Sequence, residues 1–248
     1  MILVMPLAGR GSRMQAVSPQ PKPLIPVAGR PMIEWALRGL KDIERTQVIF
    51  IALREHEERF GISATLEQLA PQHSTVVLLD DVTDGQLATV LSARHLLESD
   101  EDLLIASSDT VVCSSLQPAI EQRAAQCRGL ISVAELPGDR WSFARTDASG
   151  HVVEVAEKRR ISRWASTGLY YFSSCSEFLA ISDQWVSKHD STQELYVIPL
   201  YQKYIKNGLQ IGITHAREVW DMGTPAALAS FEQSQTLRAM LSQCSSKT

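Results

Sequence analysis

The sequence predicts an α/β protein: a Rossmann-like, mostly parallel mixed sheet flanked by helices, with a small antiparallel addition in the second half. Three observations predict this class. In the first half, apolar runs of strand length alternate with amphipathic stretches of helix length, a pattern typical of βαβ units. These strand candidates are apolar along their whole length, as expected for strands buried on both faces. After about residue 128 short strand candidates follow one another closely, which favours antiparallel pairs.

The first half alternates strand and helix candidates. An apolar strand opens the chain and leads into a glycine-containing loop. The first helix is expected at Pro31 or directly after it, because proline suits the start of a helix. The expected strands of this half are 2–7, 48–53, 76–79 and 103–106, and the expected helices are 32–40, 56–69 and 87–97.

The second half adds shorter strands and three helices. The turn from Asp147 to Gly150 predicts a hairpin between two of the strands. Asn207 and Gly208 are typical of a helix C-terminus. The expected strands are 130–134, 143–146, 152–156, 169–172 and 209–214, and the expected helices are 176–186, 194–206 and 225–241.

A chain of 248 residues and 27.5 kDa is near the upper limit for one hydrophobic core. We therefore expect a single domain over residues 1–241. It divides into a first half at 1–128, a second half at 129–224 and a C-terminal helix at 225–241. The polar residues 242–248 are expected to form a flexible tail.

Composition excludes several classes of function. The formal net charge of -4 argues against a sequence-independent nucleic-acid binder, which needs a basic face. No apolar stretch approaches the roughly 20 residues that span a bilayer, so no membrane segment is expected. The opening residues lack the features of a signal peptide. The four cysteines are widely spaced, which indicates neither a zinc site nor a disulfide framework and favours a cytoplasmic location.

The loop after the first strand is a candidate phosphate-binding segment. Gly9 and Gly11 leave room for backbone N–H groups to surround a phosphate, and Arg13 and Lys22 add positive charge. The third glycine of a dinucleotide fingerprint is absent, because position 14 is Met14. An ordinary glycine turn with two solvated basic residues is the alternative.

Two aspartates are candidate metal ligands. Asp109 follows the buried strand 103–106, at the carboxyl end where open α/β sheets bind their ligands. Asp221 lies shortly before the last helix. Its alternative explanation is structural, because Thr224 before Pro225 is an ordinary N-cap and an acid near a helix start is favoured by the dipole.

Two further segments carry candidate binding residues. Gly85 and Gln86 open a helix where small side chains let a flat base or ribose approach the backbone; a plain helix start capped by Asp84 is the alternative. Glu157 can accept hydrogen bonds from hydroxyls, while Lys158 can screen an incoming phosphate. Read alone, these last two residues are a solvated charge pair.

The motifs together resemble the signature of the sugar-phosphate nucleotidyltransferases. The resemblance rests on Gly9-x-Gly-Ser-Arg13, then Lys22-Pro23-Leu24, then Gly29-Arg30-Pro31-Met32-Ile33, in matching order and spacing. It implies a nucleotide-diphospho-sugar transferase-like fold of GT-A type. It further implies that residues 1–128 bind the nucleotide and residues 129–224 bind the sugar phosphate.

The resemblance also implies roles for individual residues. Arg13 and Lys22 are the expected catalytic residues that hold the triphosphate, and Asp109 and Asp221 are expected to bind Mg²⁺ jointly. Ser108 stands where many members have glycine. The implied nucleotide-binding residues are Leu7, Ala8, Gly9, Gly11, Ser12, Gly85, Gln86 and Ser108, and the implied substrate-binding residues are Glu157, Lys158, Thr167 and Gly168.

The implied activity is transfer of a nucleoside monophosphate from an NTP to a sugar 1-phosphate, with release of pyrophosphate. The segments Trp141–Arg145 and Ile161–Gly168 look most like bacterial enzymes of capsule or surface-polysaccharide synthesis, including heptose-phosphate transferases. The alternatives are a cytidylyltransferase for a non-sugar phosphate such as phosphocholine or a polyol phosphate, and a non-catalytic nucleotide or sugar-phosphate sensor. A glycosyltransferase is disfavoured because no Asp-x-Asp surrounds Asp109. The base, the sugar, the anomer and the oligomeric state, including a homodimer, stay open.

Overall fold

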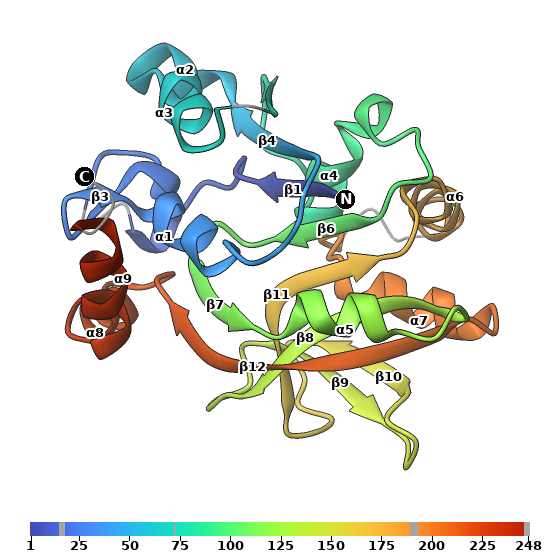
Figure 1. Cartoon of the computed structure of the whole chain (residues 1–248). Helices are drawn as coiled ribbons and strands as arrows, with labels where there is room; N and C mark the ends of the chain where they lie inside the picture. Colours follow the sequence, from blue (N-terminus) through green and yellow to red (C-terminus); the bar gives the residue numbers. More distant parts are fainter. Residues whose placement is uncertain (15–17, 72, 189–192, 246–248) are drawn as a thin grey trace.

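The structure, a computed structural model, describes residues 1–14, 18–71, 73–188 and 193–245. In this part of the chain a ten-stranded mixed sheet forms the centre, and helices cover both of its faces (Figure 1). The sheet contains β1 (Ile2–Pro6), β4 (Gln47–Leu53), β5 (Ser74–Leu79), β6 (Leu103–Ala106), β7 (Thr110–Ser114), β8 (Cys127–Glu135), β9 (Ser142–Thr146), β10 (Val152–Glu157), β11 (Trp164–Phe172) and β12 (Gln210–Asp221).

The remaining elements are helices and one small hairpin. The two short strands β2 (Pro26–Val27) and β3 (Arg30–Pro31) pair with each other. The α-helices are α1 (Met32–Gly39), α2 (Arg54–Phe60), α3 (Ile62–Leu69), α4 (Gln86–Leu91), α5 (Leu116–Gln122), α6 (Cys175–Val186), α7 (Ile198–Lys206), α8 (Pro225–Glu232) and α9 (Gln235–Ser245). Short 3-10 helices are η1 (Ser12–Met14), η2 (Lys22–Leu24) and η3 (Arg94–Leu96).

The strand order is β5-β4-β1-β6-β11-β8-β12-β7. The strands β5, β4, β1 and β6 are parallel neighbours, as the alternation of strands and helices predicts. β11 enters between β6 and β8 and is antiparallel to both. The β9–β10 hairpin extends the sheet from β11. Both predicted halves of the chain therefore contribute to one sheet.

β12 is the strand that positions the site. Its first part runs parallel to β8, and its second part runs antiparallel to β7, where Asp221 is opposite Thr110. In Figure 1 its end lies beside the start of β7 and next to α8. The strand predicted at 209–214 thus continues to Asp221, and β7 supplies the partner that lets it do so.

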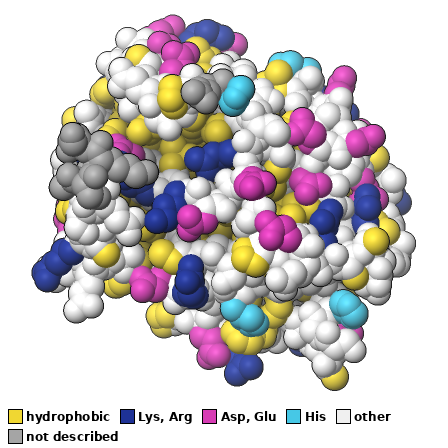
Figure 2. All heavy atoms as spheres, viewed as in Figure 1, with side chains coloured by type: hydrophobic (Ala, Val, Ile, Leu, Met, Phe, Trp, Pro, Cys, Tyr) yellow, Lys and Arg dark blue, Asp and Glu magenta, His cyan; other side chains and the backbone are white. Residues whose placement is uncertain are grey.

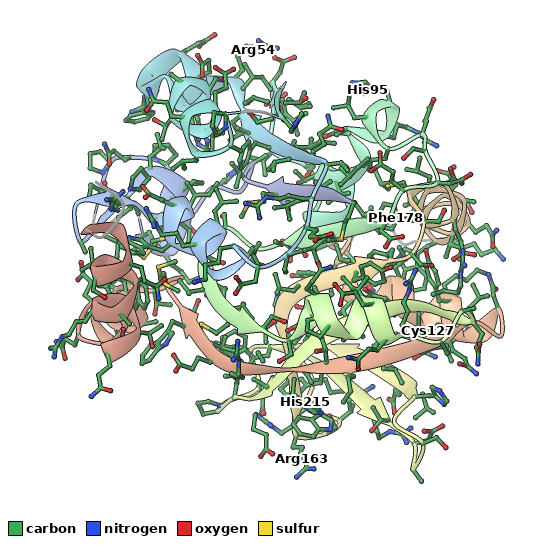
Figure 3. All side chains as sticks on the ribbon, in the orientation of Figure 1. Arg54, His95, Cys127, Arg163, Phe178 and His215 are labelled. Atoms are coloured by element: carbon green, nitrogen blue, oxygen red, sulfur yellow. The ribbon has the colours of Figure 1, made fainter. Side chains whose placement is uncertain are left out.

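The core has two layers because the central strands are apolar on both faces. Along β1, Ile2 and Val4 face one hydrophobic cluster, whereas Leu3 and Met5 face the other. This two-residue period is the geometry of a strand between two layers of helices. On the first face the ring of Phe172 stacks on Tyr201 with centroids 4.6 Å apart and also contacts Phe178 of α6 (Figure 3). Each fully buried side chain of this size contributes roughly 1.5–3 kcal/mol.

Several predicted helix boundaries are wrong. The helix predicted at 56–69 is two helices, which break at Gly61, where φ is +59°. The helix predicted at 87–97 ends at Leu91 and is followed by η3. The helix predicted at 194–206 begins at Ile198, because Leu195 instead pairs its backbone with Asp84 and Leu87.

The C-terminal helix also differs from the prediction. It is divided into α8 and α9, because Ser234 accepts a hydrogen bond from the backbone of Leu237 and starts a second helix. Residues 242–245, predicted as part of a flexible tail, belong instead to α9; the rest of the predicted tail, 246–248, lies outside the described residues. β7 and α5 were not predicted.

No helix in the described ranges is both long and apolar enough to cross a bilayer. On the face seen in Figure 2, basic and acidic side chains are interspersed and form no continuous basic stripe.

Candidate active site

A cavity of about 410 Å³ opens at the carboxyl ends of β1 and β6. Its volume is within the range of small-molecule sites. It lies where parallel strands of α/β sheets present their ligand-binding loops. The lining residues are Pro6, Leu7, Gly9, Gly11, Ser12, Arg13, Lys22, Pro23, Gln86, Ser107, Ser108, Asp109, Tyr196 and Gly223.

The signature loop forms one wall of this cavity and is anchored at both ends. At its start, the backbone N–H of Leu7 donates to Ile51 at 2.7 Å, which extends the pairing of β1 with β4. At its end, Met14 donates to the carbonyl of Gly11 and buries its side chain in the core beside α1. Met14 is therefore an apolar anchor at the position where a dinucleotide fingerprint has glycine. Ala8, one of the predicted nucleotide-binding residues, is buried and is not among the lining residues.

Lys22 enters the cavity from the first residue of η2. Its side chain is 15% exposed, and its ammonium forms an ion pair with the Asp109 carboxylate. Burial by itself raises the pKa of Asp109, but the Lys22 charge and hydrogen bonds outweigh burial and lower this pKa below its ordinary value. Asp109 is therefore ionised at neutral pH.

Asp109 and Asp221 lie side by side although 112 positions separate them. The backbone N–H of Met222 donates to the carbonyl of Asp109 at 2.7 Å. A Cβ built on Gly223 would lie 2.8 Å from Asp221 Oδ1 and 3.2 Å from both Asp109 Oδ2 and Lys22 Nζ. The two carboxylate oxygens are thus separated by no more than the sum of these distances, about 6 Å.

This pair of acids fits a hard divalent cation. Mg²⁺ takes oxygen ligands and is commonly held by one or two carboxylates together with waters and substrate phosphates. No cluster of three or more His, Cys, Asp or Glu side chains suited to a metal occurs among the described residues. A cation bound by these two acids would therefore need waters or substrate phosphates as its remaining ligands. The structural explanation of the segment also applies, because Thr224 caps α8 through a 3.3 Å bond from Ala227. Because Thr224 supplies the cap, the helix does not need Asp221 as its capping residue.

Gly85 and Gln86 lie at the start of α4 and differ in their surroundings. Gly85 has φ +123°, and a Cβ there would lie 2.6 Å from the backbone of Leu195. That backbone pairs with both sides of Gly85, because Leu195 donates to Asp84 at 2.7 Å and accepts from Leu87 at 2.8 Å. Gly85 thus allows the 195 segment to approach, while Gln86 lines the cavity. The alternative of a helix capped by the Asp84 side chain is wrong, because no side-chain bond caps α4.

Neither member of the predicted acceptor-binding pair is among the residues that line the cavity, but Lys158 contacts one of them. Glu157, at the end of β10, accepts a hydrogen bond from Ser142, and burial raises the pKa of its carboxyl group. Lys158 has φ +50°, unusual for a residue with a side chain, and strain of this kind is common at functional sites. Its ammonium binds the hydroxyl of Tyr196, which lines the cavity, and lies 3.7 Å from Glu194.

Thr167 and Gly168 are behind the cavity wall. The side chain of Thr167 is buried, and its hydroxyl has no hydrogen-bond partner among the described residues. The carbonyl of Gly168 accepts from the Ser107 backbone at 3.2 Å. Gly168 therefore contacts the segment that leads to Asp109, and its assignment as a substrate-binding residue stays a prediction.

Apart from the cavity-lining Pro6 and Pro23, which belong to the signature segments, four residues of the site region were not predicted: Ser107, Tyr196, Gly223 and Arg140. Two of them had a detectable signal, since Ser107 adjoins Ser108 and Gly223 lies within the motif of Asp221. Tyr196 and Arg140 had none, because both lie in connecting segments that tertiary structure brings to the cavity.

A glycine-containing loop, a lysine and two carboxylates lie together at the carboxyl edge of an α/β sheet, an arrangement that can bind an anionic ligand and a cation. The chain belongs to the nucleotidyl transferase family, whose model matches residues 2–237. This membership confirms the predicted family and the predicted class of enzyme, a nucleotidyltransferase.

The relatives agree with this assignment. The chain is 25% identical to the bifunctional protein GlmU of Cupriavidus metallidurans over 89% of its own length and 48% of that protein. It therefore spans about half the length of this curated relative. A nucleoside-diphosphate-sugar pyrophosphorylase from Vibrio cholerae RC9 superposes with a TM-score of 0.81, 27% identity, and coverage of 94% of this chain and 100% of the other. The inositol-1-phosphate CTP transferase from T. maritima shares the fold, with a TM-score of 0.76, 14% identity, and coverage of 94% and 96%. The predicted fold class is confirmed.

Proposed function

We propose that this chain transfers a nucleoside monophosphate from an NTP to a sugar 1-phosphate and releases pyrophosphate. The observation that carries the proposal is the convergence of Lys22, Asp109 and Asp221 around Gly223, at the edge of the cavity lined by the glycine loop. The similarity to a nucleoside-diphosphate-sugar pyrophosphorylase supports a sugar phosphate as the acceptor.

The reaction is an in-line displacement at the α-phosphorus. An oxygen of the acceptor phosphate forms the new P–O bond, and the bond to the β-phosphate breaks, so its electron pair leaves on pyrophosphate. A phosphomonoester has its second pKa near 6, so the attacking oxygen is ionised at neutral pH and needs no general base. This agrees with a cavity whose described lining contains no histidine or cysteine.

The site residues then act through charge and position. Lys22 and Arg13, both in the cavity wall, neutralise the triphosphate and hold it for in-line attack. Asp109 and Asp221 would hold Mg²⁺, which would offset phosphate charge when bound. Glu157 is placed to accept hydrogen bonds from acceptor hydroxyls, and Lys158 to meet the acceptor phosphate.

We further propose that the enzyme works in the cytoplasm and supplies activated sugars for surface polysaccharides. The widely spaced cysteines favour a reducing compartment. The segments 141–145 and 161–168, which look like those of polysaccharide enzymes, support the second part.

A substrate matrix tests the reaction. The four common NTPs are combined with hexose, heptose, choline and polyol phosphates in the presence of Mg²⁺, and pyrophosphate release is followed. We expect release with at least one sugar 1-phosphate, and a loss of roughly 10²–10³ in rate with Asp221→Asn. Release without any acceptor dependence, or full activity of the Asp221→Asn protein, would contradict the proposal.

The same matrix distinguishes the alternatives. The likeness to an inositol-1-phosphate CTP transferase is one of fold alone, but the hydroxyl-binding groups Ser142 and Glu157 suit a polyol as well as a sugar. Turnover only with CTP and choline or polyol phosphate would favour the cytidylyltransferase alternative. Nucleotide binding without turnover of any pair would favour a sensor.

A further inference from the structure

Arg140 forms an ion pair that the proposed reaction does not use. It lies in the segment 136–141, which joins β8 to β9. Its guanidinium donates to Asp221 Oδ2 at 2.7 Å and lies 4.3 Å from the centroid of the Trp141 ring. The Arg140 side chain is 46% exposed, whereas that of Asp221 is 13% exposed. An arginine from the solvent side thus covers one of the two central carboxylates.

Because of this ion pair, Arg140 competes with a divalent cation for the Asp221 carboxylate. The other carboxylate oxygen of Asp221, Oδ1, accepts from the Gly223 backbone N–H at 2.9 Å, so both oxygens of Asp221 have donors. A divalent cation that takes Asp221 as a ligand competes with these donors for the charge and lone pairs of the carboxylate. The guanidinium is the movable one, because Gly223 is fixed in the backbone and Arg140 is half-exposed.

Arg140 is also connected to the acceptor-binding residues. The carbonyl of Trp141 accepts from the Lys158 backbone at 3.0 Å. The next hydroxyl along the chain, that of Ser142, binds Glu157. A guanidinium displaced from Asp221 therefore stays attached to the acceptor side of the cavity, and its planar fork suits a phosphate as well as a carboxylate.

Neighbouring arginines have no such connection. They pair with acids that lie away from the cavity: Arg145 and Arg159 with Glu154, Arg160 with Asp139, and Arg163 with Glu135. Within this group of described arginines, Arg140 is the member whose partner, Asp221, lies next to a cavity-lining acid, Asp109.

We propose that Arg140 is a positioning residue that exchanges its carboxylate for a phosphate. In the free protein it neutralises Asp221; when a divalent cation takes Asp221, Arg140 turns to the phosphate of the acceptor. The identity of that acceptor rests on the proposed function, whereas the competition for Asp221 rests on the ion pair alone. The exchange makes the cation a condition for tight acceptor binding.

The competition is tested by Mn²⁺ titration of the nucleotide-free protein, with free Mn²⁺ followed by electron paramagnetic resonance. Arg140→Ala should bind Mn²⁺ roughly two- to fivefold more tightly than the unchanged protein, the range expected when a half-exposed ion pair no longer competes. Asp221→Asn should lose most of the binding. Unchanged or weaker Mn²⁺ binding by Arg140→Ala would overturn the competition.

Arg163→Ala is the matched control. The Arg163 guanidinium also lies over a tryptophan, 4.4 Å from the Trp164 centroid, and pairs with Glu135 at 3.5 Å. Figure 3 shows Arg163 at the outer edge of the molecule, where it points away from the ribbon. This variant removes the same charge and should bind Mn²⁺ like the unchanged protein. Tighter binding by both variants would show a general charge effect and would also overturn the proposal.

Transfer to phosphate is tested with inorganic phosphate as the probe. Binding of two ligands is reciprocally coupled, so phosphate should increase the affinity for Mn²⁺. The factor by which phosphate increases this affinity should be smaller in Arg140→Ala, by at least roughly threefold. Arg140→Lys keeps the positive charge but lacks the planar guanidinium. This variant should bind Mn²⁺ with near-normal affinity, and phosphate should increase that affinity less than in the unchanged protein. It replaces Arg140→Ala if that variant does not fold. An equal phosphate gain in all variants would refute the exchange.

These titrations need no turnover. If the substrate matrix gives no pyrophosphate while both Mn²⁺ results hold, the proposed reaction fails and the exchange stands. Normal turnover together with equal Mn²⁺ affinity in Arg140→Ala and the unchanged protein would refute only the exchange.

Discussion

The contact between Gly168 and Ser107 should control both stability and activity. A Cβ on Gly168 would lie 2.4 Å from the Ser107 hydroxyl oxygen and 3.1 Å from its Cβ, and φ at Gly168 is +83°. Gly168→Ala therefore carries two costs: a left-handed backbone and a collision. Because Ser107 lines the cavity and leads to Asp109, the collision should also displace the site.

Gly150 separates these two costs. It has the same φ of +83°, but a Cβ there would meet nothing within 4 Å. Gly150→Ala should therefore lower the free energy of unfolding by the backbone cost alone, about 1–2 kcal/mol. Gly168→Ala should cost about 1–3 kcal/mol more, the range for inserting a methyl group into a filled space. The reduced entropy of the unfolded chain affects both variants alike and cancels in the difference.

The assay is urea unfolding followed by tryptophan fluorescence, combined with a double-mutant cycle. In a Ser107→Gly background, Gly168→Ala should cost no more than Gly150→Ala, because the colliding atoms are gone. Activity should fall in Gly168→Ala and stay normal in Gly150→Ala. Equal destabilisation by Gly168→Ala and Gly150→Ala in the original background would show that Ser107 moves aside without cost and would refute the reasoning.

Three further predictions concern the charged groups. Asp109→Asn should lower kcat by roughly 10²–10³ while the circular dichroism spectrum stays unchanged, and an unfolded protein would instead assign this acid a structural role. Lys158→Ala should raise KM for the acceptor roughly 10–100-fold, because it loses a charged hydrogen bond to phosphate, while KM for the nucleotide is unchanged; equal rises would place this lysine elsewhere. Burial raises the pKa of Glu157 in the folded protein above its ordinary value of 4.5. Ionisation of Glu157 is therefore less favourable in the folded protein than in the unfolded chain. The free energy of unfolding consequently decreases as the pH rises from 4.5 through the higher pKa of the folded state. Glu157→Gln should therefore raise the melting temperature at about pH 7 and change it little at about pH 4, and a lower melting temperature at neutral pH would contradict this sign.

Much of the fold could be predicted because its strands are continuous apolar runs. β1, β4 and β6 are recognisable in this way, and their apolar length follows from burial on both faces, whereas the edge strand β5 is half-buried along its length. β7 was not predicted because its five residues begin immediately after Asp109, only a few residues after the end of β6. The whole stretch was interpreted as one strand followed by a loop. The second part of β12 contains Arg217 and Glu218, which give no apolar strand pattern. This part forms a strand because its backbone pairs with β7.

The site was predictable where one local segment carries it. The glycine loop with Arg13 and Lys22 is such a segment, and so is each aspartate by itself. That the two aspartates meet depends on the pairing of β12 with β7, which no local pattern encodes. The same limit applies to Arg140 and Tyr196, because their partners Asp221 and Lys158 are distant in sequence.

Under the proposed function, the arrangement of charge predicts that the site binds its nucleotide together with a cation. In the free protein Lys22 is paired with Asp109, and Arg140 with Asp221, so these four groups have no net charge. A triphosphate alone would have to break these pairs and would then meet two carboxylates, which repel it. A divalent cation would reverse the balance, because it would neutralise the acids and release Lys22 toward the triphosphate and Arg140 toward the acceptor phosphate. A site built only from lysines and arginines would bind any polyphosphate, whereas under the proposed function the two acids would make binding conditional on a metal that accompanies the substrate.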